Sequence, residues 1–230
     1  MITYMFSIKD VIVILDTLKL DLSNAIVYLK EQKMRFLNKG NITVVDRGNN
    51  LIVSEPGDPD VVPEPANILI TDLSGNVIEG TGQPIQNFTT HLEIYRAFPN
   101  TGAIVHSHGM YTTAWAQSGR DIPVYGTSHF DFFKEAIPCT RAMTSSEAEE
   151  DYGTAAGNCI VEIFEKKSLS PDATPGVLLF QHGAYIWGET AMEAANRAVA
   201  LEQLAMLAYL TEKINPDIKD LNRNIFPASL

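Results

Sequence analysis

The sequence predicts a single α/β domain in which helices cover both faces of one mixed sheet. Segments with strand-like and helix-like periodicity interleave along the 230 residues, which is the pattern of an α/β fold. Several neighbouring strands are joined by turns too short for a parallel crossover, so the sheet must contain antiparallel pairs. No linker or repeat divides the chain, and its 45% of hydrophobic residues are enough for one sizeable core.

Four helices are predicted from apolar periodicity and from capping signals. The first covers about 22–37, with Ser23 or Asn24 as its cap. Residues 1–20 hold a short apolar run broken by charges, which we interpret as an amphipathic lead-in helix or strand. The other three helices begin where a threonine precedes a glutamate by three residues, the spacing of a capping box. They start at Thr90, Thr144 and Thr190 and run to about Phe98, Phe164 and Lys213.

The predicted strands are apolar, β-branched runs bounded by glycine, asparagine or proline. Two of them surround the turn RGNN and form a hairpin over 42–54. After a proline-rich loop, ILITDLSGNVIEG (68–80) forms a second hairpin that turns on SGN. Further strands are expected at 103–107, at 122–126 and, as a tight strand-turn-strand, over 176–188.

Composition argues against several classes of function. With 17 basic and 28 acidic residues the net charge is −11, which disfavours a protein that binds a phosphate backbone. The two cysteines, Cys139 and Cys159, lack CxxC spacing and favour a reducing compartment. The first apolar run, Val11 to Leu15, is too short to cross a bilayer, and no cleavage site follows it. We therefore expect a cytoplasmic protein without a nucleic-acid or membrane partner.

Histidines stand at the ends of two predicted strands. His106 and His108 follow an apolar run in AIVHSHG, and their spacing puts both imidazoles on one face of a strand. His182 has the same context in VLLFQHG. Two strand ends that each deliver histidine before glycine predict a three-histidine site with an open position, as catalytic zinc prefers. The alternative is a set of hydrogen-bonded core or surface histidines, and spacing alone leaves the two interpretations about even.

Asp131 is a candidate proton carrier. It follows His129 in TSHFDFF, and a carboxyl among apolar neighbours tends to have a raised pKa, which suits proton transfer. The alternative is an ordinary aspartate that caps a helix or forms a salt bridge.

These motifs lie within segments that resemble a known family. The run from IVHSHGMYTTAWAQ to GNCIVEIFEK, and PGVLLFQHGAYIWG after it, are similar to L-ribulose-5-phosphate 4-epimerase, a branch of the class II aldolase and adducin family. The likeness extends from about Leu22 to Thr211, and GTSHFDFF and IPCTR are specific to that branch. It implies a three-layer α/β/α sandwich with a mixed, largely antiparallel sheet. We thus expect one class II aldolase-like domain over 1–230, with an N-terminal extension (1–21) and a tail (214–230).

The resemblance also implies a cofactor, a reaction and an assembly. His106, His108 and His182 would bind zinc, or another divalent metal. The enzyme would cleave and re-form a C–C bond of a sugar or sugar phosphate through a metal-bound enediolate. Asp131 matches the acid/base aspartate of the branch, and Thr127 the threonine near it. The assembly would be a cyclic homotetramer with active sites between neighbouring subunits.

The segments that would hold the substrate depart from the family pattern. Asn41 matches a residue of the phosphate loop, and Gly57 ends a second phosphate segment that reads Ser54-Glu55-Pro56-Gly57. Glu55 would repel a phosphate dianion if it faced the pocket. Asn87 stands where the family has an acid, Ile85 and Gln86 replace two serines, and the C-terminal tail lacks the catalytic tyrosine.

Three hypotheses follow from these matches and departures. The first is a zinc-dependent epimerase or aldolase of sugar phosphates. The second is a zinc lyase of an unphosphorylated hydroxy-carbonyl compound, which the altered loops favour. The third is an adducin-like scaffold without catalysis, which the loss of the acid at Asn87 favours.

Overall fold

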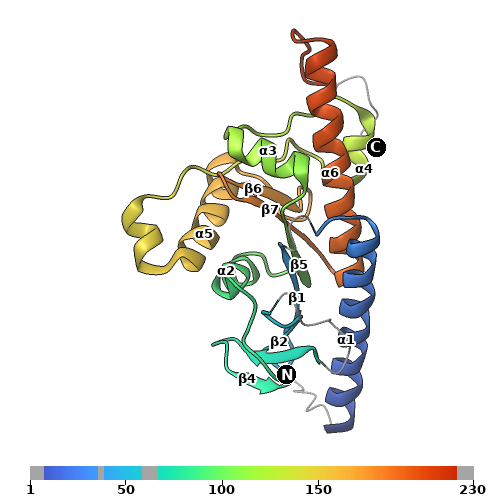
Figure 1. Cartoon of the computed structure of the whole chain (residues 1–230), viewed down its shortest axis with the longest axis vertical. Coiled ribbons are helices and arrows are strands. Elements are labelled where there is room, and N and C mark those ends of the chain that lie inside the picture. Colours follow the sequence, from blue (N-terminus) through green and yellow to red (C-terminus); the bar gives the residue numbers. More distant parts are fainter. Residues whose placement is uncertain (1–7, 36–38, 59–66, 222–230) are drawn as a thin grey trace, which may run out of the picture.

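One seven-stranded sheet forms the centre of the molecule, with helices on both sides (Figure 1). The computed structural model describes residues 8–35, 39–58 and 67–221. The strands are β1 (Asn41–Asp46), β2 (Leu51–Ser54), β3 (Leu69–Asp72), β4 (Val77–Glu79), β5 (Ala103–Ser107), β6 (Gly176–Leu179) and β7 (Gly183–Gly188). The helices are α1 (Ile8–Glu31), α2 (Phe88–Ala97), α3 (Met110–Ser118), α4 (Thr127–Phe132), α5 (Ser145–Lys167) and α6 (Ala191–Ile214).

The strand order is β4-β3-β2-β1-β5-β7-β6, and every neighbouring pair is antiparallel. The expected sheet was mixed and largely antiparallel; in the described part of the chain the only parallel contact is an isolated bridge between Cys139 and Leu178. The three predicted hairpins supply β1–β2, β3–β4 and β6–β7. Placing β5 between β1 and β7 pairs segments from both halves of the chain at the middle of the sheet.

The sheet is the middle of three layers. Along β5, Ala103 and Val105 pack with α1, α3 and α6, whereas Ile104 packs with α2 and α5. Such alternation is the period-two pattern of a strand buried on both faces. Figure 1 shows α1 and α6 along one side of the sheet and α2 and α5 on the opposite side. The three-layer α/β/α fold is therefore confirmed.

The helix expected over 22–37 is part of a longer one. α1 begins at Ile8, inside the expected N-terminal extension, and ends at Glu31; residues 36–38 lie outside the described residues. Ser23 is not a cap, because its hydroxyl donates to the carbonyl of Lys19 one turn earlier (2.8 Å).

Two other predicted boundaries are wrong. α2 begins at Phe88 and its cap is Asn87; the hydroxyl of Thr90 instead donates to the carbonyl of Gly153 (2.8 Å) and ties α2 to α5. Residues 122–126 do not form a strand, and only Ile122 bridges to Ile137. Pro123 lacks the N–H that a ladder needs, which explains the interruption. The boxes at Thr144 and Thr190 do cap α5 and α6, although Glu193 accepts from Glu189 rather than from the cap.

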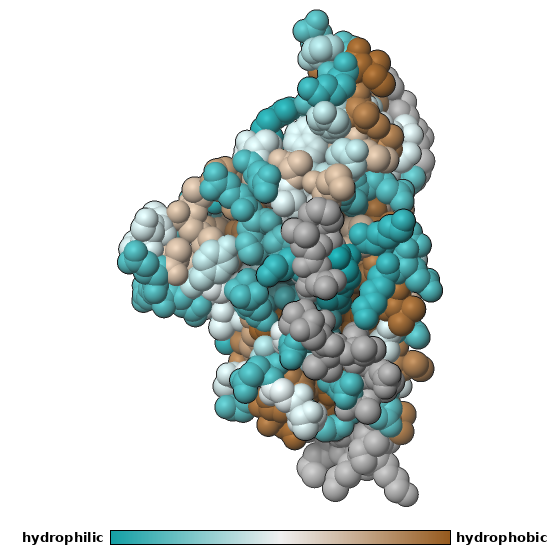
Figure 2. Space-filling view, viewed as in Figure 1, coloured by the Kyte–Doolittle hydropathy of each residue, from teal (hydrophilic) through white to brown (hydrophobic). Residues whose placement is uncertain are grey.

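The outer surface carries an apolar stripe at the C-terminal end of α6. Leu207, Leu210 and Ile214 are exposed there at helical spacing, and Figure 2 shows hydrophobic side chains gathered over this end of the molecule. None of the helices in the described ranges is long and apolar enough to cross a membrane.

Candidate metal centre

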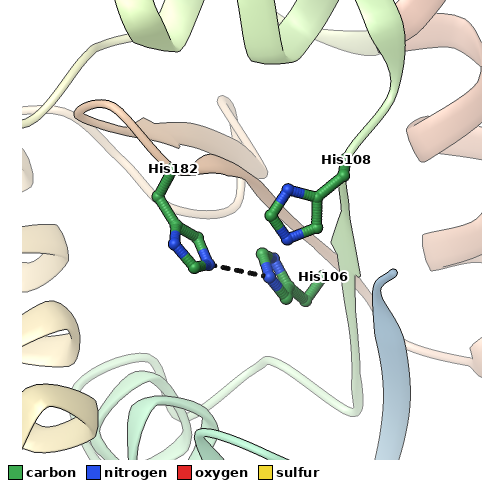
Figure 3. A group of neighbouring side chains, drawn as sticks. All are labelled: His106, His108 and His182. Atoms are coloured by element: carbon green, nitrogen blue, oxygen red, sulfur yellow. Dashed lines mark hydrogen bonds between the residues drawn. The ribbon is translucent and has the colours of Figure 1, made fainter. Parts of the chain in front are cut away.

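Two adjacent strands bring the three predicted histidines together. His106 lies in β5, His108 follows the end of β5, and His182 lies in the turn between β6 and β7. The β5–β7 register pairs Ser107 with Ala184, so the end of β5 lies beside the start of β7. One ring nitrogen from each histidine lies within 4.8 Å of the others, and Figure 3 shows the three rings facing one another.

The glycine after each histidine motif permits this close approach. A Cβ on Gly183 would lie 2.7 Å from the carbonyl oxygen of Ser107 and against the ring of His108. A Cβ on Gly109 would lie 2.2 Å from Oε2 of Glu202. That carboxylate accepts bonds from the backbone N–H groups of Tyr111 and Thr112 and so caps the first turn of α3. A glycine therefore follows each histidine motif because a larger side chain would collide with neighbouring atoms at the site.

His106 is held in a defined tautomer. Its Nδ1 lies 3.1 Å from the carbonyl oxygen of Ala184, which can only accept, so the ring proton must be on Nδ1. The lone pair of Nε2 then points to the other two histidines. The ring also stacks on Tyr185 at 4.3 Å between centroids. A hydrogen bond that orients a ligand from behind is usual at metal sites.

All three imidazoles are kept neutral by their surroundings. Burial, with smaller contributions from His182 and His108, holds the pKa of His106 well below its usual value. Burial lowers the pKa of His182 to about 4, aided by His108 and Lys39. The pKa of His108 is lowered for the same reasons, burial first and then Lys39. Neutral imidazole is the form that binds metals.

The cluster fits a divalent metal ion. In a tetrahedral zinc site with Zn–N bonds near 2.0–2.1 Å, ligand nitrogens are about 3.4 Å apart. Nε2 of His106 and Nε2 of His182 are 3.1 Å apart, and one nitrogen from each of the three rings lies within 4.8 Å of the others, so rotations of the side chains would accommodate the ion. In the described residues the cluster consists of these three histidines alone. Three histidine ligands would leave coordination positions free for a substrate, as in catalytic sites.

A cavity of about 900 Å³ lies beside the histidines. Three of the predicted substrate-binding residues line it: Asn41, Gly57 and Asn87. Asn41 pairs with His106 across β1 and β5, and its amide donates to the carbonyl of Gln86 (3.3 Å). A Cβ on Gly57 would collide with the carbonyl oxygen of Pro84 (2.3 Å), so this glycine lets two cavity loops touch. Asn87 adopts the left-handed conformation (φ 62°), which asparagine tolerates well.

Glu55 lines the cavity, yet its charge is compensated. Nη2 of Arg35 donates to both carboxylate oxygens, at 2.7 and 2.8 Å, and the backbone N–H of Ile42 donates to Oε1 (2.9 Å). The expected repulsion between Glu55 and a phosphate is therefore largely cancelled. Lys39 also lines the cavity. Two cations and one carboxylate give the lining a net charge of +1, although the chain as a whole carries −11.

The structure does not bring Asp131 and Thr127 into this cavity. Both lie on α4 and are exposed, and neither is among the lining residues. The neighbouring Phe133 is buried while Asp131 faces outward. Within one chain, Asp131 thus lacks the apolar surroundings that its sequence neighbours suggested.

Several cavity residues were not predicted from the sequence, and Arg35, Lys39 and Tyr152 are the charged or hydrogen-bonding ones that bear on the site. Arg35 and Lys39 both follow the end of α1, in KMRFLNKGN, where nothing in the local pattern distinguishes them from surface charges. Tyr152 lies in an acidic stretch of α5, and its hydroxyl is 3.0 Å from Nδ1 of His182. Only the fold reveals that contact, because no local motif links positions thirty residues apart.

Comparisons with known proteins agree with the fold. An "L-fuculose 1-phosphate aldolase" superposes with a TM-score of 0.72 at 22% identity, covering 91% of this chain and 92% of the other. YgbL of Escherichia coli, titled a putative aldolase/epimerase/decarboxylase, gives 0.70 at 19%, with 92% and 96% covered. A sugar-phosphate aldolase from Thermotoga maritima gives 0.63 at 20%, with 87% and 96% covered. The family model "Class II Aldolase and Adducin N-terminal domain" matches residues 21–209. The chain therefore belongs to the class II aldolase and adducin family.

Proposed function

We propose that this protein is a zinc-dependent aldolase or epimerase of a sugar phosphate, similar in reaction to L-ribulose-5-phosphate 4-epimerase. The observation that carries the proposal is the cluster of His106, His108 and His182 beside an open cavity. A divalent cation held there would polarise substrate oxygens and stabilise the charge that develops as a C–C bond breaks. A non-catalytic scaffold has no need for neutral, converging imidazoles on a cavity wall.

The charge of the cavity supports an anionic substrate. Arg35 is neutralised by Glu55, which leaves Lys39 as a cation on the wall, with no ion pair to it among the described residues. An ammonium group on the wall of a cavity attracts a phosphate group. The local positive charge contrasts with the net charge of −11 of the whole chain. Asn41 and Gly57 line the same cavity and would position the phosphate end.

One observation favours the alternative, a zinc lyase of an unphosphorylated hydroxy-carbonyl compound. Ile85 lines the cavity where a hydroxyl would serve a phosphate better, and it is buried in the core beneath α2. An apolar wall suits a neutral carbon chain more than a dianion. Comparing phosphorylated and unphosphorylated substrates decides between the two.

We further propose that Asp131 and Thr127 act in the cavity of a neighbouring subunit within a homotetramer. Both residues are exposed and lie outside the cavity of their own chain. Exposed apolar residues lie on the same helix as Asp131 and on α6, which packs against α4: Phe132, Leu207, Leu210 and Ile214. Apolar area of this kind suits a subunit interface.

The first experiment tests the reaction. Zinc-loaded protein is incubated with L-ribulose 5-phosphate, L-fuculose 1-phosphate and the two unphosphorylated sugars, and both epimer formation and release of an aldehyde fragment are followed. Turnover of a phosphorylated sugar supports the first proposal, and turnover of free sugars alone selects the alternative. Bound zinc without C–C cleavage of any substrate contradicts both and favours an adducin-like scaffold.

The second experiment tests the shared site. His106→Ala should lose zinc and activity, whereas Asp131→Asn should keep zinc and lose about 10²-fold in turnover. Mixing the two variants under conditions that exchange subunits should restore activity, because about one site in four of a cyclic tetramer then combines an intact histidine cluster with an intact Asp131. No recovery, with subunit exchange demonstrated, means that Asp131 does not act across an interface.

A further inference from the structure

Tyr152 is placed at the histidine cluster by a break in α5. Asp151 has non-helical backbone angles (φ −158°, ψ 98°) and divides the helix. Its carboxylate accepts bonds from the backbone N–H groups of Gly153 and Thr154, at 3.0 and 3.2 Å, as a helix cap does. A new helical segment therefore starts at Tyr152, and its side chain reaches the cavity and His182.

The hydrogen bonds around the cluster form a chain with a defined direction. The proton of His106 is on Nδ1, bonded to the carbonyl of Ala184, so Nε2 of His106 must accept. The 3.1 Å contact with Nε2 of His182 then requires a proton on that nitrogen. Consequently Nδ1 of His182 carries a lone pair, and the hydroxyl of Tyr152 donates to it (3.0 Å).

A metal ion demands the opposite arrangement at His182. Its Nε2 is the nitrogen that points to His106, and it must offer its lone pair to the cation. The ring proton then has to be on Nδ1, where the partner within reach is the oxygen of Tyr152. A carbonyl could accept such a bond but could not donate in the other state. A hydroxyl does both, since it is donor and acceptor.

We propose that Tyr152 is a positioning residue that holds His182 in both states by reversing the direction of their hydrogen bond when the metal binds. The proposal rests on the proposed metal-dependent function. No group changes its charge: the half-buried imidazole exchanges its proton through solvent, and the hydroxyl rotates about its C–O bond. The reversal also releases the hydroxyl hydrogen of Tyr152 toward an acceptor in the cavity, which it lines.

Tyr152→Phe tests the positioning role without any substrate. The bond that Nδ1–H donates is stronger when the ring holds a dication, so losing its acceptor should weaken zinc binding more than it perturbs the metal-free protein. We expect an affinity about 10-fold lower, measured by competition with a chromophoric chelator. An unchanged affinity overturns the proposal.

Tyr95→Phe is the matched control. Its hydroxyl is likewise hydrogen-bonded, to the side chain and the carbonyl of Thr43 (2.9 and 3.0 Å), but it is buried in the core and does not line the cavity. This variant should lower the melting temperature and leave zinc affinity unchanged. A loss of affinity in Tyr95→Phe equal to that in Tyr152→Phe would mean that general destabilisation, rather than positioning, causes the effect.

The proton positions are measured directly by ¹⁵N NMR of the histidine rings. In the zinc-free protein we expect His182 to carry its proton on Nε2 and His106 on Nδ1, and in the loaded protein His182 on Nδ1. A proton on Nδ1 of His182 without zinc contradicts the reversal. Because both measurements use metal and spectra alone, they stand even if no sugar is cleaved and the proposed reaction fails.

Discussion

Glu55→Gln should lower the free energy of unfolding by about 3 kcal/mol, because it leaves the guanidinium of Arg35 without its counter-charge in a largely buried place. The side chains of Arg35 and Glu55 are only 17% and 9% exposed. Breaking a buried ion pair costs about 3–5 kcal/mol, while an exposed pair contributes at most about 1. The amide retains an acceptor for the N–H of Ile42, which puts the expected loss at the lower end of the buried range.

Urea unfolding of the zinc-free protein measures this loss, and a double-mutant cycle isolates the pair. Arg35→Met removes the guanidinium and leaves Glu55 with the backbone donor of Ile42. The double variant removes both charges, so it should be more stable than the sum of the single losses predicts, with a coupling of about 2 kcal/mol. A coupling below about 0.5 kcal/mol would mean that solvent screens this pair as it does a surface salt bridge, and the reasoning from burial would be refuted.

Three further predictions concern single positions. Gly183→Ala should weaken zinc binding about 10-fold, because its Cβ would lie 2.7 Å from the carbonyl of Ser107; unaltered affinity in a chelator competition would refute the steric argument. Burial lowers the pKa of His91 to about 3, so the unfolded chain binds the extra proton and stability falls as the pH drops below about 6.5. At pH 5 protonation of His91 in the unfolded chain should lower the free energy of unfolding by about 2 kcal/mol. In the metal-free His91→Gln variant, the free energy of unfolding should therefore depend less on pH than in the metal-free parent protein. Thr144→Ala removes a complete capping box on α5 and should cost about 1 kcal/mol in urea unfolding; no loss would mean that the exposed first turn is already frayed.

The parts of the fold and site that could be predicted depend on short-range information. The strand at 103–107 and the hairpin over 176–188 follow from local apolar runs, and their His-Gly endings predicted the convergence of the three histidines. The cap at Thr144 was also recognisable, because both halves of its capping box lie within four residues.

The features that could not be predicted are contacts between segments that lie far apart in the sequence and come together only in the fold. Thr90 has a capping spacing, yet its hydroxyl is used by a contact with Gly153 on another helix. No local sequence pattern indicates that Arg35 pairs with Glu55. The same holds for the contact between Tyr152 and His182. Asp131 follows a pattern that suggested an apolar environment, but the short helix α4 turns it outward.

The position of β7 beside β5 determines when the three histidines can come together during folding. His106 and His108 leave the ribosome well before His182, and at that stage β5 can pair with β1 but not yet with β7. His182 joins them only when β7 pairs with β5, a contact between segments far apart in the chain. Such long-range pairing forms late in folding. We therefore expect a divalent ion to bind this cluster only after β5 and β7 have paired, so that metal binding would report a completed sheet.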